Sequence, residues 1–94
     1  MIKVEELIRD GSQWKIKTLY LNPAWIIRIQ EDELLTRDLH DTGPDGKFPA
    51  GLDIRHIITK VTYASGLSTG MAIVVGSPES IHEKVIGHKQ ILRS

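Results

Sequence analysis

Apolar and polar residues alternate most clearly over residues 13–21, which predicts a β-strand. The side chains on one face of this strand are Trp14, Ile16, Thr18 and Tyr20. We expect that face to point into the core. Asn22-Pro23 ends the strand, because proline fixes its own φ and biases the preceding residue away from helix. A further strand is expected over residues 25–31.

The first nine residues fit two patterns, since their apolar positions suit a helical stripe as well as an alternating strand. Asp10-Gly11 favours the strand, because this dipeptide is typical of a tight hairpin turn and a strand follows it. We therefore expect a hairpin that closes at Asp10-Gly11. Helix is the alternative for residues 2–9.

Two more strands are expected between residues 56 and 75. Alternating β-branched residues predict the first over residues 56–63. The second is the apolar run over residues 71–75, which is typical of a strand buried on both faces beneath a covering helix. The intervening residues 64–70 supply the turn.

A helix start follows at Ser77-Pro78-Glu79. A hydroxyl cap is followed by a proline at the first helical position and by an acid near the positive end of the helix dipole. The helix is expected to run to about Ile86 and to stop at Gly87, because glycine suits a left-handed residue after the last turn. For residues 88–94 two alternatives remain, an extension of the helix and an irregular docked segment.

No periodicity is visible over residues 32–55, and residues 42–51 concentrate glycine and proline. We expect a long loop here. Long connections without regular structure are uncommon in compact domains and are often functional. The sequence therefore points to this segment, called the insertion below, as the place where function lies.

Together these elements predict one α+β domain over residues 1–94, with the insertion at about 32–55. Its core is expected to be a strongly twisted five-stranded antiparallel sheet or small barrel with one C-terminal helix. Lys15, Lys17 and Arg28 are expected to protect sheet edges from pairing with other strands, or to form a small basic stripe.

Three stretches, in this order, resemble the family of small bacterial and phage proteins typified by the flagellar protein FlbD. Leu21-Asn22-Pro23-Ala24-Trp25-Ile26 is similar to the family's Leu-Asn-Pro step between two strands. Residues 59–66 are similar to its later strand and glycine turn, and residues 72–86 to its last strand and helix. The resemblance covers about half of the chain and implies the fold. The insertion and the longer first hairpin depart from the family, so no flagellar role follows.

Composition narrows the function classes. Twelve basic residues balance twelve acidic ones, so the formal net charge is 0 and no attraction to bulk nucleic acid or to an anionic membrane is expected. The absence of cysteine excludes disulfides, thiolate metal sites and thiol nucleophiles. The acidic N-terminus lacks the apolar run of a secretory signal, and the longest apolar run is too short to span a bilayer. We expect a cytoplasmic protein of a bacterium or of a phage-infected host.

The candidate site residues lie in or beside the insertion. They are Arg37, His40, Lys47, Phe48, Arg55 and His56. Cations gathered in one stretch suit phosphate oxygens. Phe48 suits stacking on a base or gripping a partner, with packing onto its own domain as the alternative. Histidine and acid spacings match no metal motif and no nucleophile is fixed beside a base, so neither a metal, a cofactor nor a catalytic residue is expected.

The first functional hypothesis is a non-enzymatic binding or adaptor protein, a homo-oligomer that engages a partner protein through the insertion. The alternative is capture of a small phosphorylated ligand, such as a signalling nucleotide, with Arg37, Lys47 and Arg55 as phosphate contacts. A metal-assisted hydrolase is the third hypothesis.

Overall fold

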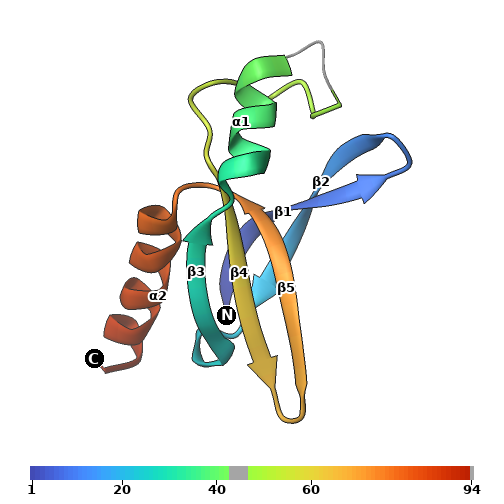
Figure 1. Cartoon of the computed structure of the whole chain (residues 1–94). Helices are drawn as coiled ribbons and strands as arrows, with labels where there is room; N and C mark the ends of the chain where they lie inside the picture. Colours follow the sequence, from blue (N-terminus) through green and yellow to red (C-terminus); the bar gives the residue numbers. More distant parts are fainter. Residues whose placement is uncertain (43–46, 94) are drawn as a thin grey trace.

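The computed structural model describes residues 1–42 and 47–93, with side chains as far as residue 87. In chain order the elements are β1 (Ile2–Asp10), β2 (Gln13–Leu21), the short 3-10 helix η1 (Pro23–Trp25), β3 (Ile26–Glu31), α1 (Glu33–Thr42), β4 (Ile58–Ser65), β5 (Ser68–Val75) and α2 (Pro78–Arg93). The strands form one antiparallel sheet in the order β2-β1-β5-β4-β3. The predicted α+β fold is confirmed, as an open sheet with β2 and β3 at its edges (Figure 1).

Both tight hairpins turn on a glycine. β1 and β2 pair along their whole length, and the turn is Gly11-Ser12, one residue beyond the predicted Asp10-Gly11. Gly11 has a φ of 63° and Gly66, between β4 and β5, has a φ of 64°. A positive φ at the first turn position is the mark of a type II′ hairpin, and glycine adopts it without steric cost. The predicted strand over residues 2–9 is confirmed, and its helical alternative is wrong.

The sheet carries a hydrophobic core on each face. The first core consists of Ile2, Val4, Leu21, Val61, Ala72, Val74, Ile81 and Val85. The second consists of Leu7, Leu39, Phe48, Leu52 and Ile58. Val74 belongs to the first core while Ile73 and Val75 pack against the second, because successive strand residues point to opposite faces. The expectation that the apolar run of β5 is buried on both faces is therefore confirmed for residues 72–75 and wrong for Met71, which is 62% exposed.

The prediction of which face of β2 points inward is wrong for most of the strand. Ile16 and Tyr20, on the predicted inner face, are 39% and 61% exposed, whereas Leu21 on the other face is 6% exposed. Of the predicted face, only Trp14 packs against a core, the second one. Alternation separates two faces but does not say which face a helix will cover. Here α2 covers the face that carries Leu21.

The insertion is not one irregular loop, so that prediction is wrong for residues 33–42, which form α1. Asp32 caps this helix, since its Oδ1 accepts a hydrogen bond from the backbone N–H of Leu35 at 3.1 Å. Beyond α1, Phe48 and Leu52 are 6% and 3% exposed and complete the second core. Residues 43–46 of the glycine- and proline-rich stretch lie outside the described residues.

The predicted start of α2 is confirmed and its predicted end is wrong. The N–H of Ser80 donates to Oγ of Ser77 at 3.1 Å, as a hydroxyl cap does. The helix continues through Gly87 to Arg93, so extension was the correct alternative for that part of the tail. Gly87 does not have a positive φ, and it stays in the helix interior, which costs about 1 kcal/mol relative to alanine. In the part of the chain that the structure describes, no helix has the length and hydrophobicity needed to cross a bilayer.

Figure 1 shows what this arrangement leaves uncovered. α2 lies beside β3, α1 sits above the upper ends of β3 and β4, and the β1–β2 hairpin projects away from the other strands. In this view the junction of β3 with α2 lies below α1, whereas the C-terminal end of β3 leads directly into α1.

Candidate functional site

The two histidines among the predicted site residues tie the insertion together. Nε2 of His40 donates to the backbone carbonyl of His56 at 2.8 Å, which joins α1 to the segment before β4. Nδ1 of His56 accepts from the backbone N–H of Asp53 at 3.1 Å. The same nitrogen lies 3.2 Å from Oδ1 of Asp53. These bonds give both imidazoles a structural role.

Arg55 forms a close ion pair with Asp53. Its Nε lies 3.0 Å from each carboxylate oxygen and its Nη2 lies 2.6 Å from Oδ2. The side-chain hydrogen bonds from Arg55, joined by a backbone one, hold the pKa of the Asp53 carboxyl well below its usual range. The same pairing raises the pKa of Arg55. A phosphate would have to compete with Asp53 for this guanidinium.

Phe48 packs onto its own domain, which was the alternative to stacking on a base or gripping a partner. Its ring stacks on Trp14, with centroids 6.1 Å apart and planes 7° from parallel. The backbone N–H of Trp14 donates to the carbonyl of Lys47 at 2.7 Å, and the Arg9 guanidinium lies 5.1 Å from the centroid of the Trp14 ring. The segment after the undescribed residues is thereby fixed to the tip of the first hairpin.

Arg37 and His40 share an open depression of about 510 Å³ on α1. The other polar side chains that line it include three carboxylates, those of Glu31, Glu33 and Asp41. Neither Lys47 nor Arg55 lines this depression. The three predicted phosphate contacts thus meet in no described cavity, and capture of a phosphorylated ligand stays a prediction. Among the residues whose positions are described, no group of three or more His, Asp or Glu side chains is placed to hold a metal ion.

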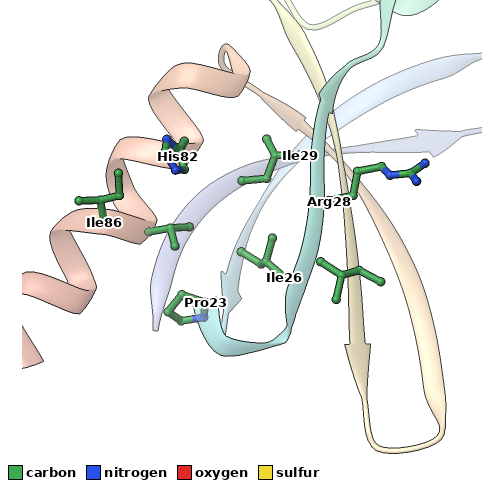
Figure 2. A pocket seen from close by; sticks show the side chains of 8 residues that line it. Pro23, Ile26, Arg28, Ile29, His82 and Ile86 are labelled. Carbon is green, nitrogen blue, oxygen red and sulfur yellow. The ribbon is translucent and has the colours of Figure 1, made fainter.

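A second region, which the sequence patterns did not single out, lies between β3 and α2 (Figure 2). We call it the β3–α2 surface, a shallow groove of about 340 Å³. Its lining residues are Pro23, Ile26, Ile27, Arg28, Ile29, His82, Val85 and Ile86. Figure 2 shows Ile26 and Ile29 pointing from β3 toward α2, while Arg28 points to the opposite side of the strand. The groove is mostly apolar.

Large apolar side chains are exposed along this surface. Ile27 is 64% exposed and Ile86 is 40% exposed, and the neighbouring Trp25 of η1 is 42% exposed. The register of β3 on β4 shifts between Ile26 and Arg28, so Ile27 sits in a β-bulge without a partner residue in β4. In a regular strand the side chain of residue 27 would lie on one face of the sheet. In the bulge, the Ile27 side chain is instead largely exposed.

The backbone of β3 also has a free side. The N–H of Asp32 donates to the carbonyl of Ile58 at 2.8 Å. This bond identifies Asp32, and every second residue before it, as the residues whose N–H and C=O groups point toward β4. Because alternate residues of an antiparallel ladder turn their N–H and C=O groups to the same side, those of Ile29 and Glu31 point outward. β3 is the last strand in the sheet order, so within residues 1–42 and 47–93 no strand receives these groups.

The two edges of the sheet differ in chemistry. β2, the other edge, carries the exposed lysines Lys15 and Lys17, as expected of an edge protected against pairing. β3 carries Arg28 as its one basic residue together with three isoleucines. The signal for this surface was present in the sequence, because the run of apolar residues from Trp25 to Ile27 occupies more than one face of a strand.

No protein-family model, no curated protein and no solved structure matches this chain. The resemblance to the FlbD family therefore stays a prediction.

Proposed function

We propose that this protein is a non-enzymatic binding or adaptor protein, and that it contacts another polypeptide through the β3–α2 surface. The observation that carries the proposal is the coincidence of an apolar groove with an unpaired strand edge. Either feature alone is common on protein surfaces. Together they match strand addition, in which main-chain hydrogen bonds give affinity and pockets beside the strand give specificity.

In this arrangement an extended segment lies antiparallel to β3. Its backbone pairs with the outward N–H and C=O groups of Ile29 and Glu31. Its side chains on the α2 side enter the groove beside Ile26 and Ile29, which Figure 2 shows directed into it. Burial of the exposed part of Ile27 adds about 1–2 kcal/mol of apolar contact.

The insertion is a second candidate surface for the same function. Leu34 on α1 and Ile54 before β4 are 74% and 71% exposed. The inner side of the same segment is packed into the second core, so both side chains are displayed on a fixed support. They are separate apolar residues with charged neighbours, however, and single exposed residues are common on protein surfaces. The β3–α2 surface is the better supported of the two.

Site-specific photo-crosslinking tests the proposal. A benzophenone amino acid is placed at position 27, on the proposed surface, and in separate variants at position 34 on α1 and at position 17 on the lysine-bearing edge. After irradiation in the native host, position 27 is expected to give a discrete protein adduct and position 17 none. An adduct at position 34 alone would mean that the partner contacts the insertion and not the β3–α2 surface. No adduct at either position 27 or position 34 would overturn the proposal.

A further inference from the structure

We infer that the polypeptide paired with the edge of β3 is β3 of a second copy of this chain, antiparallel to the first about a two-fold axis through Ile29. The inference rests on the proposed function and names the partner at the same surface. Such an isologous contact uses one patch twice, so the patch must be complementary to itself.

The backbone meets this requirement. In an antiparallel pair, residues directly opposite each other lie on the same face of the sheet, so a two-fold axis must pass through one residue position of β3. The outward N–H and C=O groups belong to Ile29 and Glu31. With the axis at Ile29, the two copies of that residue exchange both of their hydrogen bonds.

The side chains on the α2 side also match. Ile29 is partly buried against the first core and lines the groove. Placing the two Ile29 side chains opposite each other joins the groove of one copy to that of the other, and the apolar layer continues across the axis. An axis at Gln30 would instead set Ile29 opposite Glu31 and interrupt the apolar layer at its centre, whereas the axis at Ile29 places each Glu31 opposite the bulged Ile27, at the end of the paired segment.

The charges along β3 favour the antiparallel orientation. Arg28 stands toward the N-terminal end of the strand, and Glu31, Asp32 and Glu33 stand at and beyond its C-terminal end. In the antiparallel pair each Arg28 lies opposite Gln30 of the other copy and diagonal to Asp32 of that copy. The formal net charge of 0 adds no long-range repulsion between copies.

Gln30 gives a test that depends on the register. It is exposed, and it lies on the same side of β3 as Arg28. With the axis at Ile29, Gln30→Glu faces the Arg28 guanidinium of the other copy and tightens the dimer, while Gln30→Lys faces the same guanidinium and weakens it. With the axis at Gln30 the residue faces itself, so both substitutions weaken the dimer.

Sedimentation equilibrium of the full chain measures these effects. The wild type is expected to dimerise reversibly, Gln30→Glu to lower the dimer Kd roughly two- to tenfold, and Gln30→Lys to raise it by a similar factor. The double variant Arg28→Glu/Gln30→Lys restores the opposite-charge pair and returns the Kd toward the wild-type value. Gln13→Glu and Gln13→Lys, exposed on the other edge, are matched controls expected to leave the Kd unchanged.

Thermal unfolding of each variant at low concentration accounts for the effect of Lys60, which lies opposite Gln30 within the chain. A protein that stays monomeric to roughly millimolar concentration, or weakening by both Gln30 substitutions, would overturn the inference. In the monomeric case, a crosslink from position 27 to a different protein would leave the proposed function standing, and the absence of any crosslink would remove both.

Discussion

Thr36 and Ile58, which lie 22 positions apart in the chain, are joined by two hydrogen bonds. The Thr36 hydroxyl accepts from the backbone N–H of Ile58 at 2.9 Å and donates to its carbonyl at 3.3 Å. Both residues are buried, with Thr36 7% exposed and Ile58 fully covered. The Thr36 side chain thus satisfies both backbone polar groups of the first residue of β4. These two bonds help to hold α1, a helix that packs few apolar residues, on the sheet.

Replacing this hydroxyl by a methyl group should destabilise the protein. Thr36→Val keeps the shape but leaves the buried N–H of Ile58 without an acceptor, which costs about 1–3 kcal/mol. Urea denaturation of Thr36→Val and of Thr36→Ser, which retains the hydroxyl, measures the difference. If the valine variant is as stable as the wild type while serine is not, the hydrogen bonds contribute nothing and packing alone matters.

Phe48 should be among the most sensitive positions of the second core. Phe48→Ala removes a 6% exposed ring that stacks on Trp14 and is expected to cost about 3–5 kcal/mol. Phe48→Leu keeps most of the apolar volume and should cost less. An unchanged melting temperature in Phe48→Ala would mean that this segment does not stabilise the fold.

Deletion of residues 41–51 is expected to lower the temperature of the thermal transition strongly, because it removes Phe48 from the second core.

A side chain at position 70 is expected to displace the ring of Tyr63. The ring of Tyr63 lies over Gly70, and a Cβ at position 70 would come within 2.7 Å of Cζ and Oη of that ring. Gly70→Ala should therefore cost about 1–3 kcal/mol through overpacking. Gly51→Ala is the control, since nothing lies within 4 Å of its added Cβ.

The cost of Gly70→Ala should shrink in a Tyr63→Ala background. A double-mutant cycle on the free energies of unfolding measures this coupling. Additive effects would show that the two residues do not constrain each other.

The Asp53–Arg55 ion pair should give stability a weak dependence on acidic pH. The pKa of Asp53 in the folded protein lies below its ordinary value of 3.8, so the pair's contribution is fully present above that value. It is lost as the pH falls further toward the folded-state pKa. Because both side chains are substantially exposed, the contribution is small. Unfolding free energies measured between neutral pH and roughly pH 2 should fall less steeply for Asp53→Asn than for the wild type. If the unfolding free energies of the two proteins fell equally steeply with decreasing pH, the Asp53–Arg55 pair would make no pH-dependent contribution to stability.

The sequence was most informative where a local rule decides the structure. Ser77-Pro78 sets the start of α2, and the glycine at the turn sets the first hairpin. α1 was missed because its buried side includes Thr36 and only two leucines at a helical interval, Leu35 and Leu39, which is too short an apolar stripe to stand out before a glycine-rich stretch.

The candidate site could be predicted only in part. The sequence shows which side chains are able to bind a ligand, but it does not show which strand lies at the edge of the sheet. Arg55, His40 and His56 were singled out for their chemistry, and the structure uses all three in bonds within the insertion. The exposure of Ile27 depends on β3 being an edge strand and on the bulge at that residue. Both follow from pairing between distant segments, which the local pattern of β3 does not contain.

Neighbouring residues of β5 serve opposite cores, and this has a consequence for how the molecule unfolds. Val74 packs beneath α2, whereas Ile73 and Val75 pack toward α1 and Phe48. A disturbance on either face is transmitted through one shared strand to the other, so neither layer is able to melt alone. We expect amide protons in the middle of β5 to exchange only through global unfolding.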